Sequence, residues 1–185
     1  MDALILDFDG TLVEPFTARS LAGARAAVAR LGCDMPVAIL TNQGGPAYRL
    51  AGSLRHPSPG QVASNLDRGL RAVGLPPARV ARLAVATWPG NAWQGRPAEA
   101  HFGAALAEAQ IQAALVQLGW AQARVSGSSD WRKPQPGALV WLALQLGVSP
   151  VDITLVGDRD TDRSCASGAG CRFQWADDWH AGRQP

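Results

Sequence analysis

Residues 3–13 read Ala-Leu-Ile-Leu-Asp-Phe-Asp-Gly-Thr-Leu-Val, a short apolar run that ends in two carboxylates. The continuous apolar stretch from Leu4 to Leu6 is typical of a strand that is buried on both faces of a parallel sheet. Asp7 and Asp9 then fall at the carboxyl end of that strand, which is where open α/β sheets bind their ligands. Because a buried strand has no structural need for two acids one residue apart, this stretch indicates chemistry at the edge of a sheet.

Apolar strands and amphipathic helices alternate along the rest of the chain. Glycine-terminated helices are predicted over residues 21–31, 59–73, 102–118 and 139–146. Further strands are predicted over residues 37–40, 82–87, 153–156 and 171–175. The stretch Ser58-Pro-Gly-Gln61 predicts a capping box at the start of the second helix. Strands that alternate with helices predict a parallel sheet covered on both faces, so we expect a doubly wound, Rossmann-like α/β fold with five strands, in a single domain over residues 1–185.

The bulk composition is that of a folded protein without a membrane anchor. The chain has 185 residues, of which 47% are hydrophobic and 17% charged, and this is typical of globular domains. No apolar run reaches transmembrane length, and the first strand begins too close to Met1 for a signal peptide. Cys33, Cys165 and Cys171 are an odd number without CxxC spacing, which predicts reduced thiols. We therefore expect a cytoplasmic protein that does not bind membranes.

Lysine occurs only once in the sequence. Of the 17 basic residues, sixteen are arginine and one is Lys133. Arginine presents a planar fork, whereas lysine presents a compact ammonium group that arginine cannot replace. Chance retention at the surface is the alternative, but Lys133 falls within one of four ordered polar motifs. We therefore interpret it as part of a site.

The four polar motifs follow one another in a fixed order. They are Asp7-Phe-Asp-Gly-Thr11, Thr41-Asn-Gln43, Arg132-Lys-Pro134 and Gly157-Asp-Arg-Asp-Thr-Asp162. Their order resembles the haloacid dehalogenase (HAD) superfamily of phosphohydrolases over about residues 3–176. The Thr-Asn-Gln and Arg-Lys-Pro-x-Pro-Gly forms are most similar to subclass IIIA, which includes histidinol-phosphate phosphatase, heptose-bisphosphate phosphatase and the phosphatase half of polynucleotide kinase-phosphatase.

The resemblance implies different roles for the first two acids. Asp7 would be the nucleophile that attacks phosphorus and forms an aspartyl-phosphate. A carboxyl group with an ordinary pKa of about 4 is already ionised at neutral pH and needs no activating base. Asp9 would be the general acid that protonates the leaving group, and then the base that activates water.

The carboxylates of this site require a compensating cation. Asp7, Asp9, Asp158 and Asp162 would gather up to four negative charges beside a substrate phosphate, at a cost of several kcal/mol. Mg²⁺ is suited to a few carboxylates, waters and a phosphate oxygen. The resemblance implies that Asp7 and Asp158 provide side-chain ligands and Asp9 its backbone carbonyl. It also implies that Lys133 bridges Asp7 and the phosphate, and that Asp162 orients Lys133 or a metal-bound water.

Further residues are candidates for binding the substrate. The resemblance implies that the Thr41 hydroxyl and the Asn42 N–H bind phosphate oxygens. Trp88, Trp131 and Arg132 lie near the expected site and could contact the rest of the substrate. Aromatic side chains can stack on a base or a sugar, although packing in the core is the alternative for the tryptophans.

The substrate class remains open among several alternatives. We expect a phosphatase for a small phosphorylated metabolite, with a 3′-phosphorylated nucleic-acid end as the alternative. A phospho-acceptor signalling domain and a non-catalytic binding domain are alternatives of other classes. An acid/base group at Asp9 disfavours the first, and the intact set of acids disfavours the second. No cysteine lies between Cys33 and Cys165, so the zinc-binding Cys/His loop of the heptose branch is absent. About thirty residues separate Thr11 from Thr41, which leaves no room for a large cap domain there.

Overall fold

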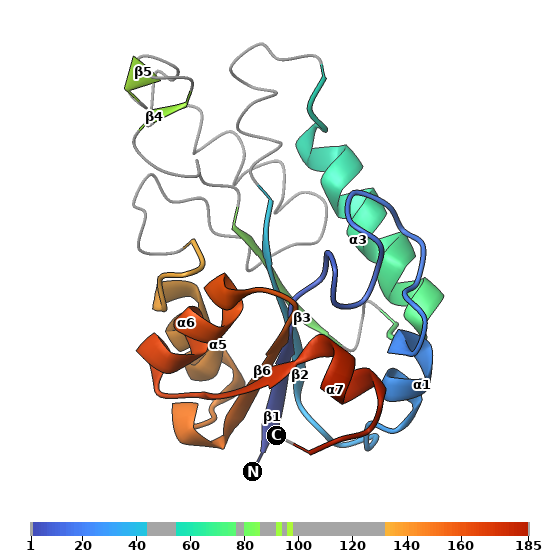
Figure 1. The fold of residues 1–185 in the computed structure, drawn as a ribbon, viewed down its shortest axis with the longest axis vertical. Helices are drawn as coiled ribbons and strands as arrows, with labels where there is room; N and C mark the ends of the chain where they lie inside the picture. The colour runs from blue at the N-terminus through green and yellow to red at the C-terminus, as the bar shows by residue number, and fades with distance from the viewer. Residues whose placement is uncertain are drawn as a thin grey trace.

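The computed structural model describes residues 2–43, 55–76, 80–85, 92–93, 96–97 and 132–184. Its main sheet has five parallel strands in the order β3-β2-β1-β6-β7 (Figure 1). The strands are β1 (Ala3–Leu6), β2 (Val37–Asn42), β3 (Ala81–Val85), β6 (Ile153–Gly157) and β7 (Arg172–Trp175). A separate antiparallel pair is formed by β4 (Ala92–Trp93) and β5 (Arg96–Pro97). The parallel α/β class predicted from the sequence is confirmed.

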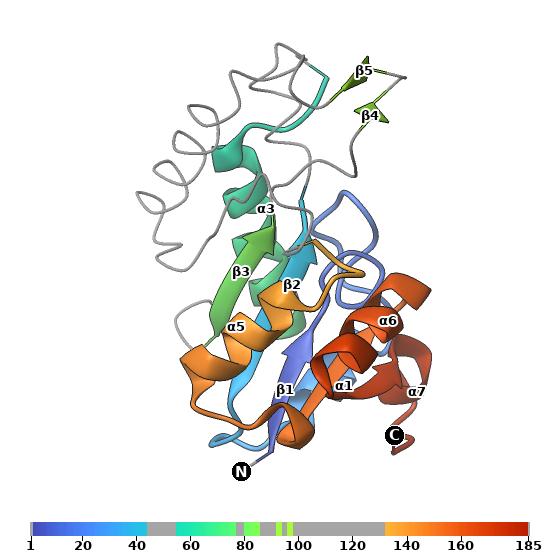
Figure 2. The same cartoon turned by 90° about the vertical axis from the view of Figure 1, so that its left-hand side faces the viewer.

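Helices cover both faces of the sheet (Figures 1 and 2). One face carries α1 (Ala24–Ala29), α3 (Pro59–Val73) and α7 (Ala176–His180), and the other carries α5 (Gly137–Leu146) and α6 (Asp160–Ala169). A short 3-10 helix, η4 (Pro150–Asp152), precedes β6. Alternate residues of β1 enter the two cores: Leu4 and Leu6 pack on the first side, and Ala3 and Ile5 on the second. This double burial is why the strand lacks a polar face.

The helix ends follow the predicted signals, with one exception. Ser58 and Gln61 form the predicted capping box at the start of α3, and Gly74 ends this helix with a φ of 88°. The helix predicted over residues 21–31 is shorter, because α1 spans only Ala24–Ala29. Leu21 and Leu31 nevertheless pack against the core from outside the helix, so the apolar repeat was longer than the helix itself. The helix predicted over residues 102–118, and with it the question of a cap, lies outside the described residues.

The described residues bear on the predictions about membrane-spanning segments and about the cysteines. Within these residues, no helix is long and apolar enough to cross a membrane. None of Cys33, Cys165 and Cys171 forms a disulfide. Cys165 is buried, and its thiol donates a hydrogen bond to the Gln135 carbonyl. The thiols therefore play no part in cross-linking the fold.

Candidate active site

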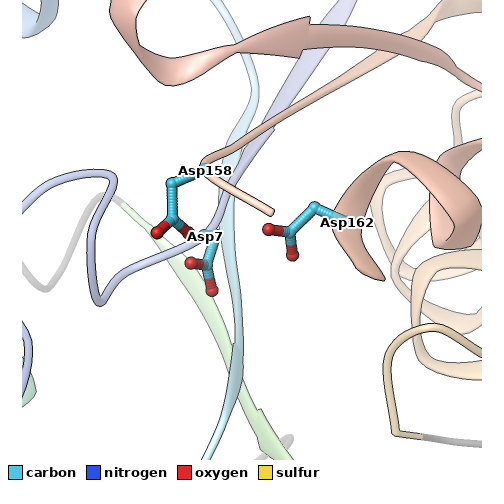
Figure 3. A group of neighbouring side chains, drawn as sticks. All are labelled: Asp7, Asp158 and Asp162. Carbon is cyan, nitrogen blue, oxygen red and sulfur yellow. The ribbon is translucent and has the colours of Figure 1, made fainter. Parts of the chain in front are cut away.

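Three of the predicted acids converge at the carboxyl ends of two adjacent strands. Asp7 follows β1, Asp158 follows β6, and Asp162 lies in the first turn of α6. The two strands pair in parallel, with Leu6 opposite Val156, so the residues after them emerge side by side. Figure 3 shows the three carboxylates directed toward one another. One oxygen of each lies within 4.8 Å of one oxygen of the others.

Two glycines permit this close approach. Gly10 has a φ of +85°, and a Cβ atom at this position would lie 2.2 Å from Asp158 Oδ2. A Cβ atom on Gly157 would lie 2.5 Å from Asp162 Cγ. Both distances are far below van der Waals contact, so any side chain would displace an acid. The glycines of the Asp-Gly-Thr and Gly-Asp motifs therefore have a steric role in the site.

Replacing Gly10 by Ala is expected to disturb the site more than its backbone strain alone would. Gly74→Ala is a matched control, because Gly74 has a φ of +88° with no atom within 4 Å of its Cβ position. Each alanine should cost on the order of 1 kcal/mol of stability through its left-handed backbone conformation. The resemblance implies that Asp158 is a ligand of Mg²⁺, so only Gly10→Ala, which displaces Asp158, should also weaken that binding. Mg²⁺ titrations monitored by thermal unfolding compare the two, and equal Mg²⁺ affinity would contradict the steric role.

Lys133 is the central cation of the cluster. Its side chain is buried, and its Nζ atom lies 2.6 Å from Asp7 Oδ1, 2.6 Å from Asp162 Oδ1 and 3.1 Å from the Leu40 carbonyl oxygen. An ammonium group has three hydrogens, so these three acceptors use all of them. Lys133 is thus not a surface residue. The predicted bridge from Lys133 to a phosphate would require one of these contacts to be shared or exchanged.

One lysine does not neutralise the acids around it. Burial raises the pKa of Asp7 to about 6, against the lowering effect of Lys133 and with a further raising effect from Asp162. Burial also raises the pKa of Asp158, and the nearby Arg159 opposes this increase. Burial lowers the pKa of Lys133, but the two carboxylates outweigh it, so that its pKa is raised overall. The site therefore has an excess of negative charge that a bound cation would relieve.

Both carboxylate oxygens of Asp162 have partners within the protein. Its Oδ1 atom pairs with Lys133, and its Oδ2 atom accepts a hydrogen bond of 3.1 Å from the Arg159 backbone N–H. Asp158 differs, because its Oδ1 atom is buried and has no hydrogen-bond partner. A buried carboxylate oxygen without a donor is costly unless a cation binds it. This difference favours Asp158 over Asp162 as a metal ligand.

Asp9 lies on the loop that follows β1 and is held through both of its carboxylate oxygens. Oδ1 accepts a hydrogen bond of 3.0 Å from the Phe16 backbone N–H, and Oδ2 accepts one of 2.6 Å from Gln43 Nε2. Gln43 was missed as a site residue by the sequence reasoning. Its place as the third residue of the Thr-Asn-Gln motif was the available signal.

The loop after β2 is tied to the loop that carries Lys133. Asn42 Nδ2 donates to the Lys133 carbonyl oxygen at 3.0 Å, and the Lys133 N–H donates to Asn42 Oδ1 at 3.2 Å. The Asn42 side chain thus joins the two loops, while phosphate binding by its backbone N–H stays a prediction. Thr41 is buried beside Leu40, whose carbonyl oxygen accepts from Lys133. The motif residues thus form two groups of direct contacts. Lys133 contacts Asp7, Asp162 and Asn42, and Gln43 contacts Asp9 and Thr41.

The proposed substrate-contact residues are only partly described. Arg132 is half-buried and directly precedes Lys133, and its contact with a substrate stays a prediction. Trp88 and Trp131 lie outside the described residues. The predicted tryptophan contacts therefore also remain predictions.

Part of the sequence and the fold as a whole are similar to those of known proteins. Residues 130–175 match the HAD-hydrolase-like family model, and no curated protein matches the chain in sequence. The D,D-heptose 1,7-bisphosphate phosphatase of B. bronchiseptica, solved with magnesium and phosphate, is 21% identical, with coverage of 94% of this chain and 79% of that one and a TM-score of 0.62. A putative HAD-like phosphatase of Mesorhizobium loti is 22% identical, with coverage of 92% and 69% and a TM-score of 0.55. The segment with Lys133, Asp158 and Asp162 thus matches the model of HAD-like hydrolases, and the fold of the chain is similar to that of two solved phosphatase structures.

Proposed function

We propose that this chain is a Mg²⁺-dependent phosphomonoester hydrolase that acts through an aspartyl-phosphate, in a single domain. The observation that carries the proposal is the buried Asp7 carboxylate, which pairs with Lys133 at 2.6 Å and lies close to Asp158, one of whose oxygens has no hydrogen-bond partner. A buried acid, a buried lysine and an excess of negative charge at a sheet edge suit phosphoryl transfer better than structural stability.

The residues present fit a magnesium ion. Asp7 and Asp158 would hold it through their side chains and Asp9 through its backbone carbonyl, and all three would be hard oxygen ligands. Oxygens of Asp7 and Asp158 already lie within 4.8 Å of each other. Bound Mg²⁺ would supply charge neutralisation for the acids and for the substrate phosphate. Asp162 would not bind the ion directly and would instead hold Lys133 in place.

The first half of the reaction would transfer the phosphoryl group to the protein. The Asp7 carboxylate would attack phosphorus and form a P–O bond, while the bond from phosphorus to the leaving oxygen breaks. Asp9 would give its proton to that oxygen, so that an alcohol leaves. Lys133 would keep Asp7 oriented through their 2.6 Å contact. The Thr41 hydroxyl and the Asn42 N–H would bind the phosphate oxygens.

The second half would return the protein to its starting state. The Asp9 carboxylate would take a proton from a water molecule, which attacks phosphorus and releases inorganic phosphate and the Asp7 carboxylate. A phospho-acceptor switch needs a long-lived aspartyl-phosphate, and an acid/base group two residues away would shorten its life. Asp9 therefore supports the hydrolase over the switch.

A small phosphorylated metabolite is the substrate class we propose. One relative in fold is named as a heptose-bisphosphate phosphatase. The net charge of +2 supports a small substrate better than an extended polyanion.

Hydrolysis by the purified chain tests this proposal. With Mg²⁺, we expect release of phosphate from p-nitrophenyl phosphate and from at least one member of a panel of sugar phosphates, histidinol phosphate, nucleotides and a 3′-phosphorylated oligonucleotide. EDTA should reduce the rate at least about 100-fold, because the acids and the phosphate would then repel one another, and added Mg²⁺ should restore it. Inactivity across the panel, or full activity in EDTA, would contradict the proposal.

A further inference from the structure

Gln43 connects two groups that the proposed reaction uses separately. Its Nε2 atom donates to Asp9 Oδ2 at 2.6 Å and to Thr41 Oγ1 at 3.0 Å. A side-chain amide nitrogen has two hydrogens, so these two acceptors use both. An ionised carboxylate has no hydrogen to donate, so it can only accept hydrogen bonds. The amide nitrogen of Gln43, and not its oxygen, must therefore face Asp9.

The contact with Gln43 determines how Asp9 presents its proton. Each carboxylate oxygen has two lone pairs in the plane of the group. Oδ2 uses one lone pair to accept from Gln43, and Oδ1 uses one to accept from the Phe16 N–H, so each oxygen keeps one lone pair, in a fixed direction, for the proton that the leaving group would receive. Oδ1 is held by the Phe16 N–H at 3.0 Å, so the carboxylate is anchored at both ends and its plane is fixed.

The same amide determines how Thr41 presents its hydroxyl hydrogen. Thr41 is buried, and its Oγ1 atom accepts a hydrogen bond from Gln43. A hydroxyl that accepts from one side donates its own hydrogen in another direction. The Thr41 hydroxyl is therefore oriented as a donor, which is what a phosphate oxygen requires.

We propose that Gln43 is a positioning residue, which aims the Asp9 proton at the leaving oxygen and the Thr41 hydroxyl at the phosphate through one amide nitrogen. This inference rests on the proposed function and adds a residue to it. Gln43 itself need not contact the reacting atoms. Its effect should therefore be largest for substrates whose leaving group needs a proton in the transition state.

The dependence of the rate on the leaving group tests this role. Phenyl phosphate releases a basic phenoxide and needs the proton of Asp9, whereas p-nitrophenyl phosphate releases a weakly basic one and needs it less. We expect Gln43→Met to lower kcat/KM about 100-fold for phenyl phosphate and about 10-fold or less for p-nitrophenyl phosphate. The quantity kcat/KM is chosen because it reports the steps up to loss of the leaving group, whereas dephosphorylation is common to both substrates.

Gln174→Met is a matched control. Gln174 is a buried glutamine on β7, and its Nε2 atom donates to the Arg183 carbonyl oxygen. This change removes a buried amide outside the site, so kcat/KM should fall for neither substrate or for both equally. Gln43→Glu is a second test, since it keeps the size of the side chain but removes both donors, and it should reproduce the selective loss.

The outcomes separate the inference from the proposed function. A wild-type chain that hydrolyses neither aryl phosphate and no member of the substrate panel would overturn the proposed function, and the inference with it. An active wild type with equal losses for both substrates in Gln43→Met and Gln43→Glu would overturn the positioning role alone. A selective loss for phenyl phosphate, absent from Gln174→Met, would support it.

Discussion

Replacing Asp7 by Asn should reduce phosphate-ester hydrolysis by at least about 10⁴-fold, since the amide cannot form the phosphoryl intermediate. Asn keeps the size of the side chain, and its Oδ1 atom can still accept from Lys133, which lies 2.6 Å away in the wild type. The loss should therefore appear in kcat and persist at saturating substrate and Mg²⁺. Steady-state rates with p-nitrophenyl phosphate measure it.

The same variant should be at least as stable as the wild type in the absence of metal. Burial raises the pKa of Asp7 to about 6 from an ordinary 3.8, so the folded state binds its proton more tightly than the unfolded state does. Relative to high pH, protonation of Asp7 stabilises the folded state. This stabilisation is fully present below pH 3.8 and is lost as the pH rises through about 6. At pH 7.5 with EDTA, Asp7→Asn should therefore gain on the order of 1 to 3 kcal/mol. Urea unfolding at pH 4 and pH 7.5 measures the change.

A surface carboxylate provides the comparison for Asp7. Asp160 on α6 is well exposed and pairs with Arg163 at 2.9 Å. Asp160→Asn should change both activity and stability very little, because exposed ion pairs contribute under about 1 kcal/mol. Activity retained in Asp7→Asn would rule out Asp7 as the nucleophile. A variant that is inactive only because it is unfolded would contradict the stability argument.

The fold could be predicted because its signals are local. The apolar run before Asp7 identifies a strand buried on both faces, and Ser58 with Gln61 identifies a helix start that the structure contains. The length of α1 could not be predicted in the same way. Leu31 is apolar because it packs on the core, and apolar periodicity does not distinguish a residue within the helix from one that packs just beyond its end.

The site was predictable in its residue types but not in its connections. The order of the motifs selected Asp7, Lys133 and Asp158 as candidates, and the structure brings these three residues together. The contact between Gly10 and Asp158 depends on the adjacency of β1 and β6, which join segments almost 150 residues apart. The contact of Gln43 with Asp9 likewise requires the ends of β1 and β2 to be in register. Such contacts are properties of the sheet, and no single motif contains them.

Replacing Lys133 by Met should have the largest effect on stability. Methionine keeps a linear apolar side chain of similar length, but the change leaves Asp7, Asp162 and the Leu40 carbonyl without their shared donor. Removing one partner of a buried ion pair costs about 3 to 5 kcal/mol, because the remaining charge stays buried. Chemical denaturation at pH 7.5 in EDTA measures the loss. Hydrolysis should also fall about 10³-fold or more, because charge stabilisation at the phosphate is lost.

The pH dependence of that loss identifies its cause. Without Lys133, the pKa of Asp7 should rise beyond its wild-type value of about 6, since its nearest cation is gone. The cost of Lys133→Met should therefore be larger at pH 8 than at pH 5, where folded Asp7 is largely protonated and uncharged in both proteins. A cost that is equal at both pH values would assign the effect to packing and contradict the electrostatic explanation.

Two further variants complete the test of Lys133. Arg163→Met removes an exposed cation whose ion pair with Asp160 is solvated, and should cost under about 1 kcal/mol. In the double variant Lys133→Met with Asp162→Asn, one of the two uncompensated carboxylates is neutral, so part of the stability should return while hydrolysis stays low. Recovery of activity together with stability would show that Lys133 serves only the fold. Recovery of stability alone would separate its support of the buried acids from its part in phosphoryl transfer.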